Sequence, residues 1–303
     1  MQVTYGKRLL FFACLFFLLL LLLFAEPMLS ALQSGLHLCA HTVIPSLFPF
    51  MVLSSLLIRL APTHTLPGGR LFEALFHIPG IGLFALFIGS LCGFPLGARS
   101  AADLYATGHL SKKQAERLAA LSNNTGPAFC VVGVGGSFFS SPRIGWLLYG
   151  IQLFSGLLIA FLFARKEQWK SGEEKKREAV ASSPLSLSES IYSASLTLLS
   201  VTGTILFFSA LCALPKLFLS PTVFALLASF LEIGNATAAA GALSPTIGIP
   251  IAAFAISFSG LSVHLQASSV LKERDLSVFP VFYYKLLSGF LSFFLSLLLL
   301  RFL

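Results

Sequence analysis

The feature that most constrains this chain is a succession of apolar stretches that are long enough to cross a bilayer as helices. About 20 consecutive apolar residues span the hydrocarbon core of a membrane. The first stretch, 8–25, contains no charged residue from Leu9 to Phe24. Others follow at 36–60, 80–98, 118–140, 143–165, 191–214, 221–243, 246–271 and 278–303. We therefore predict an all-α polytopic membrane protein.

The composition supports this class. Of the 303 residues 56% are hydrophobic and 11% charged, and the mean hydropathy is +0.88, whereas a soluble domain carries roughly a quarter charged residues. The net charge of +8 comes from basic residues in the loops, which indicates membrane topology and a lipid-bilayer partner, not nucleic acid. The five cysteines form no C-x-x-C pair, so buried free thiols are expected.

The N-terminal stretch allows two interpretations. Lys7 and Arg8 followed by an apolar run resemble a signal peptide. The run is long, however, and no A-x-A-like cleavage site precedes Glu26 and Pro27. We predict an N-terminal transmembrane helix within 1–30, and a cleaved signal is the alternative.

One polar segment divides the chain into two similar halves. The segment from Arg165 to Glu189 mixes basic and acidic residues and should be cytoplasmic. Phe84 to Leu91 aligns with Phe224 to Leu231 at four identities, and two shorter matches follow in the same order. We therefore predict a first repeat at 31–165, a charged linker at 166–190 and a second repeat at 191–303.

The positive-inside rule gives the two repeats opposite orientations. The basic residues near the N-terminus, in the linker and between 103 and 117 should all be inside. Segment 80–98 must then enter and leave on one side, as a re-entrant or broken hairpin interrupted by glycines and Pro95. The second repeat is consequently inverted and the C-terminus lies outside; nine simple spans are the alternative. We also predict a short amphipathic helix from Asp103 to Arg117, with Ser111 as N-cap and Gln114 completing a capping box.

Glu232 is the acidic residue centred in a long apolar stretch, 221–243. An ionisable side chain at such a depth costs roughly 2.5–3.5 kcal/mol on translocon scales, so it should face a cavity or a partner. We predict that it binds a coupling ion, a proton or another cation; the alternative is a protonated structural carboxyl. Asn235, one turn further, is predicted to contact the solute.

Other polar residues interrupt the apolar segments at positions where helices should break. Inverted repeats with broken helices are typical of transporters, which bind solute near the membrane midplane at the breaks. The predicted solute-binding residues are Arg99, Asn123, Asn124, Thr125, Gly126, Asn235, Ser257, Ser259, Gly260 and Gln266. Arg99 is equally compatible with an interfacial anchor, and the run Asn123 to Pro127 with a plain helix break.

Enzyme and metal signatures are missing from the sequence. Asp103 and Asp275 lie in loops, where an intramembrane aspartyl protease could not use them, and no H-E-x-x-H, P-loop or dinucleotide fingerprint is present. His37 and His41 are one helical turn apart, but no third metal ligand is evident. We expect a protein without enzymatic activity, catalytic residues, metal or cofactor, other than the coupling ion.

Five stretches together resemble the YlbJ-type sporulation integral membrane proteins, which carry the gate or nucleoside-recognition domain. They are Val43 to Phe50 (VIPSLFPF), Gly93 to Arg99 (GFPLGAR), Asn123 to Pro127 (NNTGP), Leu231 to Asn235 (LEIGN) and Ser257 to His264 (SFSGLSVH). The sequence departs from the family pattern in places, since the family often has Gly where Ser259 stands, and Lys can replace Arg99. The resemblance extends distantly to concentrative nucleoside transporters.

The resemblance implies a secondary carrier that moves dipicolinic acid across the outer forespore membrane during sporulation. Dipicolinate is a planar aromatic dianion, so Arg99 and the run 123–126 are its expected contacts, and Glu232 is left for the coupling ion or for pairing with Arg99. A carrier for nucleosides or another small solute is the alternative within the transport class. A membrane scaffold needed for spore cortex assembly is the alternative from another class, and a homo-oligomer is compatible with either.

Overall fold

The computed structural model describes residues 2–60, 67–166 and 186–301. Every secondary-structure element in these ranges is a helix. In chain order they are α1 (Gln2–Leu23), α2 (Ala25–Leu38), η1 (Cys39–Val43), α3 (Ile44–Leu60), α4 (Gly69–Phe76), α5 (Gly82–Cys92), α6 (Leu96–Ala106), α7 (Lys112–Ser122), η2 (Ala128–Phe138), α8 (Pro142–Lys166), α9 (Leu187–Phe218), α10 (Pro221–Leu231), α11 (Ile233–Gly241), α12 (Pro245–Phe258), α13 (Gly260–Lys272) and α14 (Phe279–Leu299). The labels η1 and η2 mark π-helices, in which the backbone is wider than in an α-helix.

Four helical segments are long and apolar enough to cross a membrane. They are α8, α9, the segment Pro245–Lys272 and α14. A fifth span is counted if Lys7–Leu23 and Ala25–His41 are taken together, although these two pieces are bent by 95° at their junction. The chain is therefore an all-helical, multi-pass integral membrane protein, as the apolar stretches predict.

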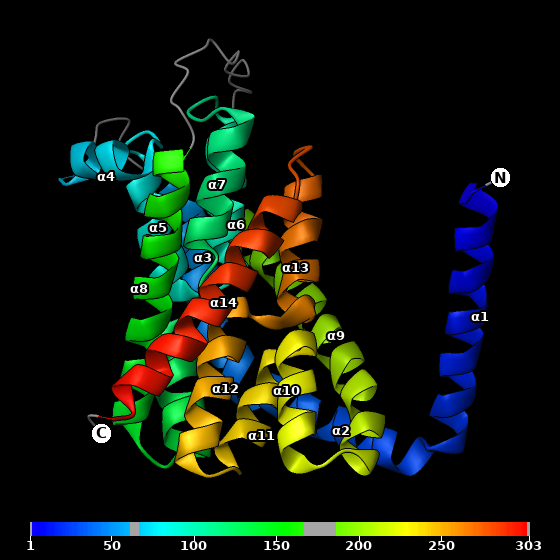
Figure 1. Cartoon of the computed structure of the whole chain (residues 1–303). Helices are drawn as coiled ribbons and strands as arrows, with labels where there is room; N and C mark the ends of the chain where they lie inside the picture. The colour runs from blue at the N-terminus through cyan, green and yellow to red at the C-terminus, as the bar shows by residue number, and fades with distance from the viewer. Residues whose placement is uncertain (1, 61–66, 167–185, 302–303) are drawn as a thin grey trace.

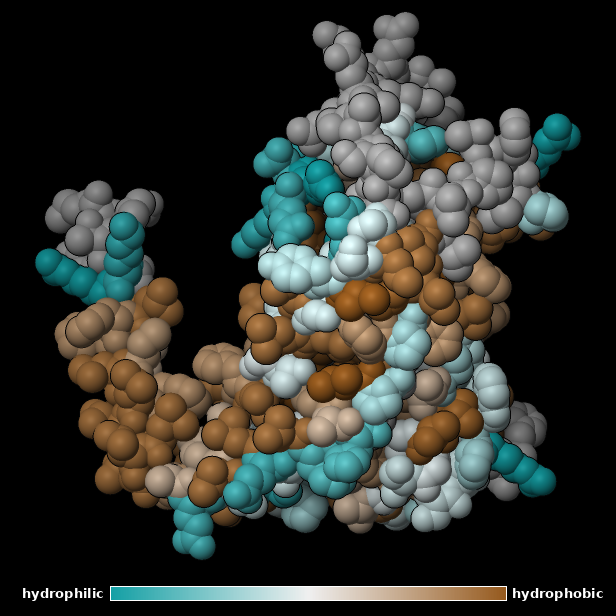
Figure 2. Space-filling view, turned by 180° about the vertical axis from the view of Figure 1, so that it is seen from behind, coloured by the Kyte–Doolittle hydropathy of each residue, from teal (hydrophilic) through white to brown (hydrophobic). Residues whose placement is uncertain are grey.

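The exterior matches a membrane environment. Large apolar side chains such as Leu199, Val132 and Phe294 are more than half exposed. Figure 2 shows apolar side chains over much of the visible face, with polar ones gathered mainly toward its two ends. Helix α1 stands apart from the main body over most of its length and meets it near Phe17, whose ring centroid lies 6.0 Å from that of Phe207 (Figure 1).

Two pairs of short helices fold back on themselves as hairpins. Helices α5 and α6 pack against each other across the break at Gly93, and α10 and α11 pack across the break at Glu232. A β-carbon added to Gly89 on α5 would lie 2.7 Å from the Cα of Gly97 on α6. Each hairpin contributes a turn of non-helical backbone inside the helical body.

Two further breaks interrupt the helices that follow each hairpin. Between α7 and η2 the chain is non-helical from Asn123 to Gly126, and between α12 and α13 Ser259 takes a left-handed conformation, with φ of 72°. The sequence predicts both breaks, and the structure confirms them. Each hairpin is thus followed by a broken helix and then by a long apolar helix, α8 or α14.

The predicted amphipathic helix from Asp103 to Arg117 is wrong in its extent. Helix α6 runs to Ala106, the chain turns at Gly108 with a positive φ of 74°, and α7 begins only at Lys112. Glycine tolerates this left-handed backbone, which ends one helix and lets the next begin. The predicted cap is confirmed, because Ser111 accepts from the backbone of Gln114 and the Gln114 side chain accepts from that of Ser111.

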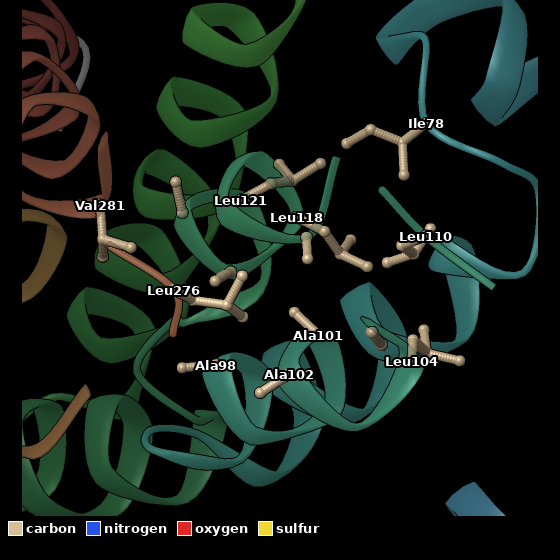
Figure 3. Close-up of a cluster of buried hydrophobic side chains, with 14 of the residues drawn as sticks. Ile78, Ala98, Ala101, Ala102, Leu104, Leu110, Leu118, Leu121, Leu276 and Val281 are labelled. Atoms are coloured by element: carbon tan, nitrogen blue, oxygen red, sulfur yellow. The ribbon is translucent and has the colours of Figure 1, made fainter. Parts of the chain in front are cut away.

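Small residues let α6 and α7 approach closely. Figure 3 shows Ala98, Ala101 and Ala102 on α6 together with Leu118 and Leu121 on α7, all in one buried cluster. Leu276, just before α14, and Val281, in its first turn, enter the same cluster (Figure 3). Since lipid is as apolar as leucine, such close backbone packing is the main source of helix association in a membrane.

Candidate functional site: a cavity between the hairpin turns and the helix breaks

The turn of each hairpin touches the break of the following helix. A β-carbon on Gly93, whose φ is +86°, would lie 3.0 Å from the backbone nitrogen of Gly126. A β-carbon on Gly260, whose φ is +70°, would lie 3.0 Å from the carbonyl oxygen of Leu231. In both halves a glycine therefore allows two stretches of non-helical backbone to meet.

The two helix breaks are also joined to each other. Thr125 Oγ1, in the first break, donates to the carbonyl oxygen of Ile256 at 3.1 Å. Ser259 Oγ, in the second break, donates to the same oxygen at 3.1 Å. The bend at Ser259 frees this carbonyl from its helical partner, so the hydroxyls satisfy an acceptor that lipid could not.

Gln152 on α8 completes the first break. Its Oε1 accepts from the backbone nitrogen of Thr125 and its Nε2 donates to the carbonyl of Thr125, each at 3.0 Å. The side chain thus replaces the backbone partners that Thr125 would have had in a continuous helix. Gln152 was not among the residues predicted from the sequence, although a single amide within the apolar run 143–165 was a visible signal.

A cavity of about 100 Å³ lies where these turns and breaks converge. Such a volume exceeds several-fold the roughly 10–15 Å³ that one water needs. Its wall includes Cys92 and Gly93 from one hairpin turn, Glu232 to Gly234 from the other, and Thr125 and Gly126 from the first break. Apolar and aromatic side chains complete the wall, among them Leu47, Phe50, Phe94, Phe129, Val201 and Ile205.

Two polar side chains in the cavity wall have no hydrogen-bond partner within the described residues. Both the amide oxygen and nitrogen of Gln266 are unpartnered, as is the hydroxyl of Ser262, one helical turn earlier on α13. Gln266 is 3% exposed and Ser262 fully buried. An unpaired buried polar group costs about 1–3 kcal/mol. These groups are therefore suited to hydrogen-bond something that enters the cavity.

Glu232 forms the turn of the second hairpin and caps α11. One carboxylate oxygen accepts from Gly234 N at 2.9 Å, and the other accepts from Asn235 N at 2.7 Å and Asn235 Nδ2 at 2.9 Å. The positive end of the α11 dipole and the side-chain amide thus face the carboxyl. Glu232 is also part of the cavity wall.

The structure distributes the sequence-predicted residues unevenly around this cavity. Thr125, Gly126, Glu232 and Gln266 are in its wall. The described wall residues do not include seven of the predicted ones, namely Arg99, Asn123, Asn124, Asn235, Ser257, Ser259 and Gly260. Asn235 donates to Ser209 Oγ on α9 at 3.1 Å.

Arg99 and Ser257 make contacts between helices instead. The Arg99 guanidinium donates to Ser193 Oγ at 2.8 Å and to Thr197 Oγ1 at 3.2 Å, and so connects α6 to α9. Ser257 Oγ lies 2.7 Å from Ser292 Oγ on α14. Ser262, which does line the cavity, was not predicted, since one serine in a serine-rich segment carries little signal.

A buried lysine also escaped the sequence analysis. Lys285 on α14 is 2% exposed, and its Nζ donates to Asn124 Oδ1 at 2.7 Å. Among the described residues, Lys285 and Glu232 are the buried side chains of Asp, Glu, Lys or Arg. The signal was its place as an isolated charge within the apolar stretch 278–303, in which the other charge, Arg301, is close to the end of the chain.

The fold and the cavity define a class: a polytopic membrane protein whose paired hairpins and broken helices enclose a small, partly polar chamber. Comparison with known proteins gives the family. The chain is 30% identical, over 304 aligned positions, to "Sporulation integral membrane protein YlbJ" of Bacillus subtilis (strain 168), covering 86% of this chain and 74% of that protein. The chain therefore belongs to the YlbJ family of sporulation integral membrane proteins.

The other two comparisons give no further relative. No family model matches the chain. No solved structure matches it either.

Proposed function

We propose that this protein is a secondary transporter of a small solute, and that the cavity between the hairpin turns and helix breaks is its solute site. The observation that carries this proposal is the pair of unpartnered, buried polar side chains, Gln266 and Ser262, in the cavity wall. Non-helical backbone inside a membrane protein is tolerated where it is buried in protein or lines a wet cavity. Here both hairpin turns contribute to the same wall.

The finer architecture that we propose is a pair of inverted repeats, 31–165 and 191–303, joined by the charged linker 166–190. The order hairpin, broken helix, long helix occurs once in each half. The matching glycines, Gly126 and Gly260, each contact the preceding hairpin turn. Figure 1 has α5 and α6 toward one end of the molecule and α10 and α11 toward the other, which supports opposite orientations.

We further propose that the hairpins are re-entrant and that α1, within the first 30 residues, is an additional transmembrane helix. In Figure 1 the N-terminus, the beginning of α7 and the end of α13 lie at one end of the molecule, and the C-terminus lies at the other. Lys112, Lys113, Lys272 and Arg274 belong to the first end. By the positive-inside rule this end is cytoplasmic, so the C-terminus is outside.

Our first candidate solute is dipicolinic acid, a small carboxylated heterocycle, moved across the outer forespore membrane. The family relative is named for sporulation, which supports this setting. The aromatic rings of Phe50, Phe94 and Phe129 in the wall offer faces for a planar ring. The amide of Gln266 and the hydroxyl of Ser262 offer donors for a carboxylate.

Glu232 has a different role in this proposal. Its carboxylate would repel a dianion, so we assign it to the coupling proton or cation, with the Asn235 amide holding it in place. Arg99 stabilises the contact between α6 and α9 and is not required to touch the solute.

A nucleoside carrier is the second candidate. Among the described wall residues no lysine or arginine faces the cavity. A neutral polar solute with an aromatic base would need hydrogen bonds and ring contacts but no cation. This observation favours a nucleoside over a dianion. Competition between uridine and labelled dipicolinate distinguishes the two.

The test is solute exchange by the purified chain in liposomes. Vesicles loaded with unlabelled dipicolinate should take up labelled dipicolinate saturably, and uridine should compete if the second candidate is correct. Q266L removes one hydrogen bond to the solute and should lower exchange about tenfold, because tenfold corresponds to about 1.4 kcal/mol. Q33L, which changes an exposed glutamine on α2, is the matched control and should leave exchange unchanged.

The same assay separates the proposal from its alternative in another class. If the folded, monodisperse protein exchanges neither dipicolinate nor uridine, the carrier is overturned and a scaffold in spore assembly becomes the better account. No catalytic role enters the proposal.

A further inference from the structure

A buried lysine outside the cavity wall has an environment that packing alone does not require. Lys285 lies six residues after Phe279, the first residue of α14, and therefore about 9 Å along the helix axis. Its side chain points inward, is 2% exposed and donates to the amide oxygen of Asn124 at 2.7 Å. It is consequently not an anchor that extends to the lipid headgroups.

The lysine lacks a counter-charge. Within the described ranges, the hydrogen-bond partner of its ammonium is the neutral Asn124 amide, and no carboxylate pairs with it. An unpaired ion in a low-dielectric interior costs several kcal/mol, and apolar residues of similar volume pack in such places at no such cost. A lysine here is therefore expensive as a structural residue.

Asn124 connects the lysine to the solute site. Its Nδ2 donates to the carbonyl of Leu121 at 3.0 Å and to Ser90 Oγ at 3.3 Å, so one amide joins α14, the end of α7 and the first hairpin. The next residue, Thr125, is in the cavity wall. A charged amine donates a hydrogen bond roughly twice as strong as a neutral one. The charge on Lys285 therefore sets how firmly α14 is joined to the first helix break.

The titratable groups around Lys285 come from three of the helices near it. Helix α12, which packs most closely on α14, contributes none. Helix α8 brings Tyr149, and α7 brings Glu116 and Arg117, with Glu116 bonded near the N-terminal end of α14. Helix α13 brings His264, whose ring centroid lies 5.2 Å from that of Phe282 on α14. Both ring nitrogens of His264 lack a partner among the described residues.

We propose that Lys285 is a second proton-binding group, in addition to Glu232, that is needed to couple solute movement to a pH gradient, and that its hydrogen bond to Asn124 transmits its charge state to the first helix break. This inference rests on the proposed transport function. When protonated, the ammonium holds Asn124 and keeps α14 fixed to the break. When it releases its proton, the neutral amine holds Asn124 more weakly and the break is free to shift relative to α14.

The experiment separates exchange from accumulation in liposomes, with labelled dipicolinate as the probe, or uridine if uridine is the solute exchanged. Exchange at equal pH on both sides needs no net proton movement, whereas accumulation driven by a pH gradient does. Wild type should do both. K285M should keep exchange within a few-fold of wild type and lose gradient-driven accumulation, and K285R, which stays charged, should show the same split. K272M, at the exposed end of α13, is the matched control and should behave as wild type.

Each remaining outcome decides the matter. If K285M accumulates solute as wild type does, the inference is overturned and the transport function stands. If both lysine variants are monodisperse but exchange nothing, Lys285 serves solute binding and the coupling role is overturned. If neither variant folds, N124D, which places a carboxylate against Lys285 and keeps it charged, must show exchange without accumulation, and failure to do so overturns the inference. If wild type itself exchanges nothing, the proposed function fails first.

Discussion

At the scale of single residues, the hairpins depend on positions where no side chain fits. A β-carbon on Gly89 would lie 1.9 Å from the carbonyl oxygen of Ser122, and one on Gly97 would lie 2.0 Å from the same oxygen. Ser122 Oγ in turn donates to the carbonyl of Gly97 at 3.0 Å. The end of α7 therefore lies against both arms of the first hairpin, with backbone touching backbone.

G97A should unfold or aggregate the protein, because the new methyl group would overlap a backbone oxygen that cannot move alone. We expect a loss of at least about 2–3 kcal/mol, as for overpacked cores, seen as a lower thermal midpoint in detergent. G150A, in the middle of α8 with no atom within 4 Å of the new carbon, is the matched control. Alanine should leave the midpoint unchanged or raise it there. A G97A protein as stable as G150A would refute this packing.

Glu232 gives a second residue-scale prediction. E232A removes the side-chain cap of α11 and leaves the amides of Gly234 and Asn235 without acceptors. The cost should be about 1–2 kcal/mol, as for other N-caps. E232Q keeps one oxygen that can accept a hydrogen bond, so it should lose less stability than E232A. The thermal midpoints of the two variants test that order. Equal midpoints would mean that the carboxyl does not act as a cap.

The sequence predicts some of these residues and not others, for a physical reason. Glu232 was identifiable because an isolated charge in an apolar run is costly wherever its partner lies. The same rule applied to Lys285. Only its partner could not be predicted, because Asn124 is 161 positions away in the chain. Arg99 looked equally functional, yet its partners Ser193 and Thr197 are ordinary polar residues of a helix whose position only the fold determines.

At the scale of elements, the breaks are held by side chains from helices elsewhere in the chain. Glycine, proline and adjacent amides reveal where a helix must stop, so the breaks at Gly93, 123–127 and Ser259 were predictable. What closes each break was not, because Gln152 and Thr125 come together only once α8 packs beside α7 and η2. The helix predicted at 103–117 was wrong because a polar pattern continues across Gly108 in the sequence. The backbone at Gly108 is left-handed and ends the helix there.

Two glutamines should respond differently to the same substitution. Q152L removes the side-chain partners of the buried N–H and C=O of Thr125, at about 1–3 kcal/mol each, and should strongly destabilise the protein. Q266L removes an amide that has no partner among the described residues. It should therefore leave the free energy of unfolding within about 0.5 kcal/mol of the wild-type value. Comparing both midpoints with wild type checks this. A larger loss for Q266L than for Q152L would contradict the assignment of structural and solute-binding roles.

At the scale of the whole molecule, the two halves present their hairpins from opposite ends (Figure 1). Asp103 and Arg274 approach within 3.9 Å, so the end of α6 and the chain after α13 lie at one end of the molecule. The apolar pattern predicted a helical membrane protein, and the charge pattern predicted which loops share a side. The meeting of both hairpin turns and the first helix break at one cavity could not be predicted from the sequence, because it depends on how the two halves pack against each other.

Cysteine accessibility in intact cells tests the proposed orientation. K113C and K272C, at the cytoplasmic end in this account, should be closed to a membrane-impermeant maleimide added outside and should react after permeabilisation. S220C and S244C, in the turns before α10 and α12, should react from outside. Labelling of K113C from outside would refute the inverted scheme.

The central claim is that solute occupies the cavity between the hairpin turns, and Cys92, a native thiol in its wall, reports on that directly. The measurement is the rate at which a small thiosulfonate modifies Cys92, followed by mass spectrometry, with and without saturating solute. We predict that solute slows the modification several-fold, that modified protein stops exchanging solute, and that C92A is insensitive to the reagent, while the exposed Cys14 on α1 reacts equally in both conditions. An unchanged rate at Cys92 in protein that exchanges the solute would contradict the account.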